Sequence, residues 1–445
     1  MKSASSRKGF ADFNLLYSLM PSKFVLKLKA MERLKRNSLV VQDKLLSENN
    51  TIEIVVDNEK RVPQVGQYSK AGQQLRVDFI KDTTEVSLEH LSNQVEFEDN
   101  KQLKGNIENF IGMSQLPTGI IGPIVIDGQN AKGSFYAPLA TSEGTLVASY
   151  ARGARACRQS GEISAICLKE GVQRSPIFKF ANLKQVFQFT KWIEQEQSKF
   201  NSIVQQTSNY AELIKVELNV EGNQVIINLE YTTGDASGQN MVTFASQALC
   251  EYILANCPVE PEYWFLESNY SGDKKATVLS FTSVRGRKVS AEITLKKEVV
   301  RDTLKTTPEL MFTYWQTSFM GASKCGAIGA QGHFANGLAA IFIACGQDVA
   351  CVSEASVGIT RMEVDGNGDL YCTVTLPNLI VGTVGGGTSL PTQKECLEIM
   401  DCYGTGKAKK FAEICGALCL AGEISIIAAL SAGHFAAAHE KHGRV

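Results

Sequence analysis

Several features are scarce in this 445-residue chain, and each scarcity excludes a class of protein. Charge is balanced, with 45 Lys and Arg against 46 Asp and Glu and a formal net charge of −1. The chain therefore lacks the basic character of a nucleic-acid binder, and we expect no nucleic-acid partner. Hydrophobic residues make up 44% and charged residues 20%, which excludes a mainly disordered chain.

Long hydrophobic runs and cysteine motifs are missing as well. No run of 18 uninterrupted apolar residues occurs, so we predict no membrane span, and the N-terminus lacks the apolar core of a secretory signal. The twelve cysteines show no CxxC spacing and lie in apolar segments such as 341–352. They predict reduced thiols in a cytoplasmic protein. The five histidines form no HxxxH or HExxH pattern, so we predict no metal site.

The hydrophobic pattern predicts a mixture of helices and hairpins. An apolar stripe from Leu146 to Cys157 predicts a helix that ends near Gly161, with Ser142 as its N-cap and Glu143 in its first turn. Further elements are expected as an amphipathic helix at 24–34, helices at 184–200 and 242–254, hairpins at 216–231 and 360–376, and strands at 277–284 and 289–295 joined by a turn at 285–287.

Some ionisable residues stand where charge is otherwise rare. Glu143, Asp348 and His439 lie in low-charge segments, and Asp273 is followed by two lysines. Taken singly, each is more often part of a structural ion pair than of an active site. Two glycine-rich segments, 234–241 and 382–388, would let backbone N–H groups approach a phosphate.

Taken together, these segments identify a family. Residues 108–112, 138–144, 234–241, 273–275, 346–348, 382–388 and 432–439 occur in the order and with the spacing of the 3-hydroxy-3-methylglutaryl-CoA reductase family. The chain resembles the catalytic part of its eukaryote-type class, without the membrane anchor of that class and without the C-terminal flap domain of the bacterial-type class.

The resemblance implies an α+β fold. It consists of a helical N-terminal and dimerisation segment (1–111), a large α/β substrate domain (112–175 and 267–445), and a small inserted ferredoxin-like cofactor domain (176–266). The implied reaction reduces an acyl-CoA thioester to an alcohol in the mevalonate pathway, with two hydrides from NADPH or NADH. The implied assembly is a homodimer with active sites at the subunit interface.

The resemblance also assigns roles to residues. Lys274 matches the cation that stabilises negative charge on the substrate oxygen, and Glu143 matches the proton donor. Asp348 matches the aspartate that links the two, and His439 matches the histidine that protonates the departing CoA thiolate. The implied substrate and CoA residues are Arg174, Asp273, Lys275, His333 and Asn336. The implied cofactor residues are Ser142, Ser208, Asp235, Ser237, Gly238, Gln239, Asn240, Met241, Val384 and Gly385.

Three positions depart from the family pattern. Gln316 replaces the lysine that meets the free carboxylate of the substrate, and Glu267 replaces a serine. Asn209 replaces the arginine that reads the 2′-phosphate of NADPH, which slightly favours NADH. Two alternatives therefore stay open beside the leading one: the same chemistry on an acyl thioester that lacks the distal carboxylate, and a CoA-binding pseudoenzyme.

Overall fold

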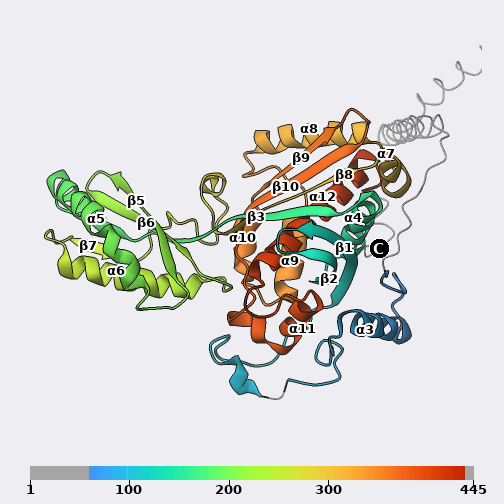
Figure 1. Ribbon diagram of the computed structural model, residues 1–445, viewed down its shortest axis with the longest axis horizontal. Coiled ribbons are helices and arrows are strands. Elements are labelled where there is room, and N and C mark those ends of the chain that lie inside the picture. The colour runs from blue at the N-terminus through green and yellow to red at the C-terminus, as the bar shows by residue number, and fades with distance from the viewer. Residues whose placement is uncertain (1–59, 98, 436–445) are drawn as a thin grey trace, which may run out of the picture.

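The protein is described by a computed structural model, which covers residues 60–97 and 99–435. The predicted helix at 24–34 and the predicted catalytic residue His439 lie outside these residues. Within them, helices surround two antiparallel-rich sheets that share one long strand (Figure 1). The predicted α+β class is confirmed.

The larger sheet has the strand order β2-β1-β3-β8-β10-β9, in which only β1 and β3 run parallel. Its strands are β1 (Thr118–Gly128), β2 (Lys132–Ala140), β3 (Ile163–Arg174), β8 (Gly286–Leu295), β9 (Ile359–Val364) and β10 (Leu370–Leu379). The helices of this body are α4 (Leu146–Ser160), α7 (Lys297–Val299), α8 (Pro308–Cys325), α9 (Phe334–Ala344), α10 (Val352–Ala355), α11 (Pro391–Ile399) and α12 (Ala408–Ser431).

The smaller sheet begins where the end of β3 pairs with β6. Its other strands are β4 (Ile177–Lys179), β5 (Glu212–Glu221), β6 (Gln224–Thr232) and β7 (Tyr263–Phe265), and its helices are α5 (Leu183–Val204) and α6 (Gln239–Asn256). This body has a hydrophobic core of its own, built from residues between Val172 and Leu266. Figure 1 shows β3 running from the larger body on the right into the smaller one on the left.

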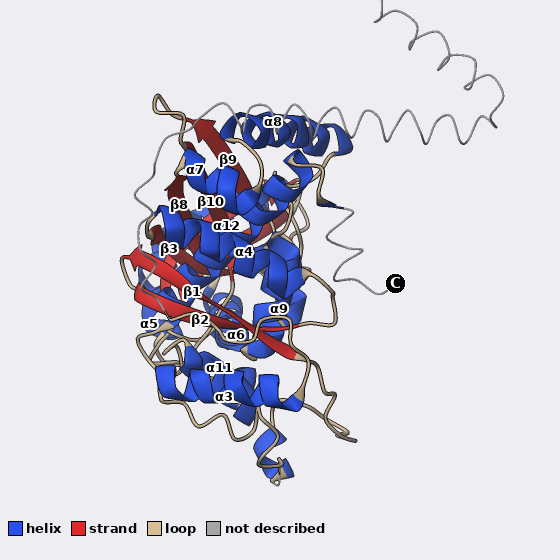
Figure 2. Cartoon of the chain, turned by 90° about the vertical axis from the view of Figure 1, so that its right-hand side faces the viewer, coloured by secondary structure: helices blue, strands red, loops and turns tan. Residues whose placement is uncertain are grey.

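Helix α12 forms the centre of the larger core. It is buried around its whole circumference from Phe411 to Ser425, and it packs on α4, α9, β3 and β8. Figure 2 shows α4 and α12 beside the strands of the sheet. Among the described residues, α12 alone is long and apolar enough to cross a bilayer by length and composition, and 83% of its most apolar window is buried inside the structure. Such burial is typical of a core helix.

The N-terminal part of the described chain packs against the larger body. Helix α3 (Lys70–Thr84) begins at Ser69, whose hydroxyl accepts a hydrogen bond from Gly72 N. A small apolar cluster, Ile80, Leu88, Tyr136 and Ile399, joins this region to β2 and α11. Short turns complete the elements: η1 (Asn100–Leu103), η2 (Val278–Phe281), η3 (Val300–Leu304), η4 (Val349–Cys351) and η5 (Gly386–Ser389).

Most predicted elements are confirmed, and three predictions are wrong: the N-cap of α4, the strand at 277–284, and the turn at 285–287, whose last two residues lie in β8. Helix α4 starts at Leu146 after Thr145 in a left-handed conformation, so Ser142 does not cap it and Glu143 precedes its first turn. Residues 277–284 are not a strand. They contain the short helix η2, in which Val278 is 71% exposed, and a strand needs a buried apolar face to be stable.

Candidate active site

The Asp273–Lys275 and 346–348 motifs meet in one cluster. Lys274 Nζ lies 2.8 Å from Asp348 Oδ2, and both side chains are about two-fifths exposed, at 44% and 39%. The hydrogen bond to Asp348 is the main cause that raises the pKa of Lys274, so its ammonium stays charged at neutral pH. The Lys274 ammonium is therefore a partly exposed cation that is held in place by Asp348.

Buried ion pairs of Arg285 hold the segment that carries Lys274. Arg285 Nε lies 2.6 Å from Glu354 Oε2, and Arg285 Nη2 lies 2.7 Å from Asp273 Oδ1. Glu354 Oε1 accepts a hydrogen bond from Lys274 N at 3.2 Å. Lys274, Asp348, Asp273, Arg285 and Glu354 are called the lysine cluster below.

Arg174 and Glu267 extend the lysine cluster toward the smaller body. Arg174 Nη1 lies 3.2 Å from Glu267 Oε2 and 3.4 Å from Asp273 Oδ2. Arg174 Nε, Glu267 Oε1 and Gln239 Nε2 are buried without a hydrogen-bond partner in the described structure. Buried polar atoms without partners are costly, so these three atoms suit the polar groups of a bound ligand.

A second group forms around the start of α9. Asn336 Nδ2 donates to both carboxylate oxygens of Glu143, at 3.0 and 2.8 Å. His333 N donates to Glu423 at 2.6 Å, and its carbonyl accepts from Tyr150 Oη at 2.6 Å. Glu143, Asn336, His333, Tyr150 and Glu423 are called the glutamate cluster below.

The members of the glutamate cluster differ sharply in burial. Glu423 is fully buried, which raises its pKa, whereas Glu143 is exposed. Burial lowers the pKa of His333 to about 4, so the imidazole is neutral at physiological pH, and its Nε2 atom is buried without a partner in the described structure. His333 is therefore a neutral, buried ring, stacked on Tyr150 at the start of α9.

The glycine-rich loops lie in direct backbone contact with each other. A Cβ atom on Gly382 would stand 2.6 Å from Ser237 N, so only glycine allows this approach. Gly382 N donates to Gln347 Oε1 at 2.7 Å, which ties this loop to the residue before Asp348. Gly238, with φ of +80°, caps the start of α6.

Other predicted cofactor residues are arranged around these loops. Asp235 is engaged within the chain, since its carboxylate accepts from Gly406 N and Ala408 N at the start of α12. Ser208 and Asn209 precede Tyr210, which lies beside Gly234: a Cβ atom added to Gly234 would stand 3.9 Å from the Cβ atom of Tyr210. Asn209, Ser142, Asn240 and Gly385 are exposed, and Ser237, Met241 and Val384 are half-buried.

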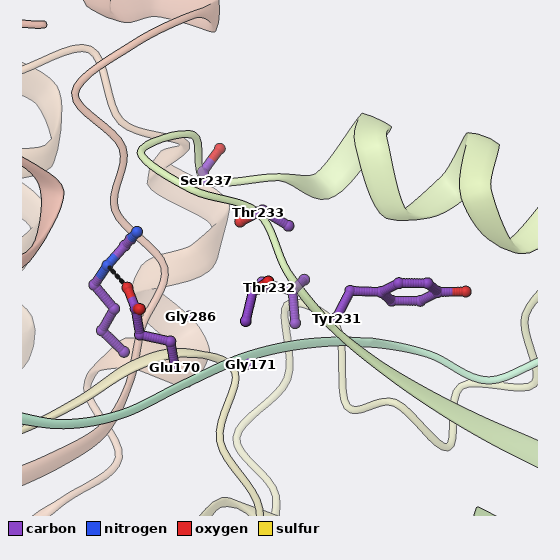
Figure 3. Close-up of a pocket in the computed structure, with 9 residues that line it drawn as sticks. Glu170, Gly171, Tyr231, Thr232, Thr233, Ser237 and Gly286 are labelled. Carbon is purple, nitrogen blue, oxygen red and sulfur yellow. Dashed lines mark hydrogen bonds and ion pairs between the residues drawn. The ribbon is translucent and has the colours of Figure 1, made fainter. Parts of the chain in front are cut away.

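A small cavity separates the two bodies below the 234–238 loop. Figure 3 shows its lining from Glu170 and Gly171 of β3, Gly286 of β8 and the segment from Tyr231 to Ser237. Arg287 also lines it and forms an ion pair with Glu170. Its volume of about 10 Å³ holds one water at most. Arg287 also donates to the carbonyls of Val381 and Gly234, so it anchors both glycine-rich loops.

The structure leaves some predicted residues apart from these clusters. Gln316 is exposed on α8, away from both clusters. Lys275 lies at the edge of the lysine cluster, exposed, with its Nζ donating to the carbonyl of Asp273. No hydrogen bond within the described chain joins Asp348 to Glu143, the link that the resemblance implies. No group of three or more His, Cys, Asp or Glu side chains in the described ranges is arranged to hold a metal ion.

Sequence reasoning missed four residues that hold the site: Arg285, Arg287, Glu354 and Glu423. The two arginines are predicted to lie in a turn, but both are buried, and Arg287 lies in β8. Glu354 and Glu423 stand in apolar segments, as Glu143 and Asp348 do. A single charge in a low-charge segment therefore marks Glu354 and Glu423 as candidates too, but it does not predict which residues they contact.

Fold and site together define an α+β protein with glycine-rich loops at the junction of its two bodies. The chain belongs to the hydroxymethylglutaryl-coenzyme A reductase family, whose model matches residues 72–444. It is an oxidoreductase of the NAD(P)H-dependent kind by that membership.

Relatives support this membership over most of the chain. A 3-hydroxy-3-methylglutaryl-coenzyme A reductase of Pyrococcus abyssi is 38% identical over 405 residues, which covers 88% of this chain and 98% of the relative. The enzyme of the same name from Aeropyrum pernix is 42% identical over 353 residues, covering 78% of this chain and 84% of the relative.

A solved structure matches the fold. The class II 3-hydroxy-3-methylglutaryl-CoA reductase of Streptococcus pneumoniae, bound to NADPH, aligns with a TM-score of 0.65 and 18% identity over 80% of this chain and 96% of that one. At that identity the likeness shows the fold alone. The eukaryote-type class stays a prediction.

Proposed function

We propose that this protein reduces 3-hydroxy-3-methylglutaryl-CoA to mevalonate and free CoA, with two hydrides from a nicotinamide cofactor. The observation that carries the proposal is the Lys274–Asp348 ion pair of 2.8 Å. It lies where the lysine motif, the 346–348 motif and, through Gln347, the glycine-rich loop at Gly382 converge. A regulatory pseudoenzyme has no use for such a charged lysine, because binding alone needs no stabilised oxyanion.

Lys274 supplies the positive charge in this proposal. Each reduction step develops negative charge on the substrate oxygen, and a fixed ammonium near that oxygen lowers the barrier. Asp348 holds the ammonium in place and favours its charged form. The Arg285–Glu354 pair below fixes the backbone on which Lys274 stands.

Glu143 is the proposed proton donor, held by Asn336. A carboxylic acid stays protonated at neutral pH only in an apolar or negatively charged surrounding. The described part of this chain leaves Glu143 exposed, so that surrounding must come from substrate, cofactor or a second chain. His439 is the proposed donor to the CoA thiolate.

The two glycine-rich loops and the start of α6 are proposed to hold the cofactor. Their exposed glycines and the partnerless Gln239 amide suit a dinucleotide. When bound, the nicotinamide supplies hydride to the substrate carbon. The inserted body around α5 and α6 is the proposed cofactor domain, with boundaries near residues 176 and 266.

A homodimer is proposed as the working unit. The segment predicted to mediate dimerisation exposes several apolar side chains, with Ile111 fully exposed and Ile107 and Met113 about half exposed. Exposed apolar side chains close together are typical of an interface. A dimer would also explain why Glu143 forms no hydrogen bond with Asp348 of its own chain in the described structure: the two clusters of one site would come from two copies.

The proposed location is the cytoplasm. All twelve cysteines are free, and most of them are buried. A reducing compartment keeps such thiols free.

One observation favours a second candidate substrate. Arg174 is already neutralised by Glu267 and Asp273, which leaves less positive charge for the free carboxylate of the substrate. The second candidate is therefore an acyl-CoA thioester without that distal carboxylate.

One assay tests the proposed function. Oxidation of NADH and of NADPH is followed at fixed enzyme concentration with 3-hydroxy-3-methylglutaryl-CoA and with a panel of simpler acyl-CoAs. We expect turnover of the glutaryl thioester. Turnover of only the simpler thioesters would favour the second candidate, and no turnover of any thioester would contradict an enzymatic role.

A further inference from the structure

We propose that Arg285 and Glu354 are positioning residues that fix the Lys274–Asp348 ion pair in its reactive geometry. The proposal rests on the proposed function, in which Lys274 is the catalytic cation. Both side chains are almost fully buried, with Arg285 at 3% and Glu354 at 0% exposure. Buried ion pairs are often no more stabilising than apolar residues of the same volume, so stability alone is a poor explanation for this one.

The pair holds the lysine loop from two sides. Glu354 Oε1 accepts the backbone N–H of Lys274, and Arg285 Nη2 holds the carboxylate of Asp273, one residue earlier. Lys274 has a φ of +56°, a left-handed conformation that a lysine adopts only when surrounding contacts enforce it. The two hydrogen bonds are the contacts that enforce it.

The same pair also holds the aspartate. Asp348 Oδ1 accepts from Ala350 N and so caps η4, which leads directly into α10, the helix that carries Glu354. The Glu354 carboxylate therefore joins the segment of Lys274 to the segment of Asp348. Loss of that link would let the two halves of the ion pair shift relative to each other.

Arg285 connects the pair to the ligand-binding surroundings. Its Nη1 donates to the carbonyl of Gln173, next to Arg174, and its Nη2 donates to Gln239 Oε1 at the start of α6. Three nitrogens of one planar guanidinium thus reach four partners, counting Glu354 and Asp273. A lysine has a single nitrogen and cannot reproduce this fork.

The test compares Glu354→Gln with Glu413→Gln. Glu413 is a matched control, since it is also fully buried and accepts backbone N–H groups from Asn130 and Ala131 in the β1–β2 turn and from Cys167 in β3. For Glu354→Gln we expect kcat to fall by about tenfold to a hundredfold, the range caused by small misplacements of a catalytic group. We expect KM for both substrates to change less than about threefold.

The pH profile supplies a readout that a purely structural role would not move. The charged or titratable groups that face the Lys274 ammonium are Asp348, Asp273 and Cys351. The hydrogen bond to Asp348 raises the pKa of Lys274, so a loosened pair lowers it. The alkaline limb of the kcat profile should therefore move to lower pH in Glu354→Gln. Glu413→Gln should lower the melting temperature without changing kcat or this limb.

Each outcome decides the proposal. An inactive wild type would contradict the proposed function, whereas an active wild type with Glu354→Gln equal to the control would overturn the positioning role alone. A loss confined to KM, or a lower kcat with an unmoved alkaline limb, would overturn it as well. Should Glu354→Gln fail to fold, Arg285→Lys takes its place: the same kcat loss and limb shift support the proposal, and wild-type values overturn it.

Discussion

The lysine cluster and the glutamate cluster hold their functional side chains by different interactions. The lysine cluster lies on buried ion pairs, with Arg285 and Glu354 beneath an ammonium that already has its partner. The glutamate cluster lies on backbone hydrogen bonds to Glu423 and Tyr150, and its working carboxylate is exposed. One chain therefore completes the cationic part of the proposed site and leaves the acidic part open.

This difference predicts how the two clusters respond to substitutions and to pH. Ion pairs fix the lysine cluster internally, so its geometry depends on charge. The backbone of the glutamate cluster is held by the buried carboxylate of Glu423 and carries the neutral His333. The protonation of Glu143 depends on the substrate, cofactor or second chain that covers it. Substitutions in the two clusters should accordingly differ in size and in pH dependence.

The largest effect is expected from Lys274→Ala, which removes the cation from the lysine cluster. Turnover should fall by at least about 10² to 10³, the cost of losing one oxyanion-stabilising donor. Melting temperature should change little, because Lys274 is partly exposed. Cofactor oxidation measures the loss, and Lys132→Ala, at an exposed lysine on β2, is the control. Near-normal turnover would remove Lys274 from the mechanism.

A smaller effect is expected from Asn209→Arg, which should leave both clusters intact. We expect the wild type to use NADH at least as well as NADPH, because a neutral amide cannot offset the charge of a 2′-phosphate. The variant should shift the ratio of kcat/KM values toward NADPH by about tenfold, or about 1.4 kcal/mol. A wild-type preference for NADPH above about tenfold would show that another cation reads the phosphate.

The smallest effect concerns the pH dependence of folding stability. His333 in the glutamate cluster and Lys274 in the lysine cluster contribute to it with opposite signs. The pKa of His333 is about 4 when folded against 6.5 when free. Between these values the unfolded chain binds more protons, so stability should fall as pH drops from 6.5 toward 4. Lys274, whose pKa is raised, instead stabilises the fold below its ordinary pKa, and that contribution is lost as pH rises through the folded value.

Melting temperatures at pH 4.5 and pH 7 check the histidine term. His333→Gln should reduce the difference between the two temperatures, because glutamine has no proton to gain. An unchanged difference would assign the acid sensitivity to other groups. Glu423, a buried acid hydrogen-bonded to the same backbone, works in the opposite sense, because a raised pKa stabilises the fold as pH falls.

The sequence alone predicts the fold class and most elements because their signals are local. Apolar periodicity locates α4, α5 and α6, and turn residues locate the hairpin of β5 and β6. It fails at residues 277–284, where an apolar pattern is not matched by a buried face. It also misplaces the start of α4, since the left-handed Thr145 is not encoded by residue type.

The candidate site is predictable only in part for a related reason. Motifs mark Lys274 and Asp348, and the structure joins them. The partners beneath them are set by tertiary packing: Arg285 and Glu354 are 69 residues apart in sequence, and neither belongs to a recognisable motif. Glu267 is marked in the sequence only as a replacement for a serine, whereas the fold pairs it with Arg174.

Subunit complementation tests the central claim, that two chains share one site, most directly. Lys274→Ala and Glu143→Gln are co-expressed with different tags, and the mixed dimers are compared with each variant alone. If each site takes its lysine cluster from one chain and its glutamate cluster from the other, one of the two sites in each mixed dimer is intact. The purified mixed dimers should then have about half of wild-type activity, and the unseparated, randomly paired mixture about a quarter. Co-expression of Lys274→Ala with Asp348→Asn is the control and should restore none, because both changes lie in the lysine cluster. Mixed Lys274→Ala and Glu143→Gln dimers as inactive as the single variants would contradict the shared site.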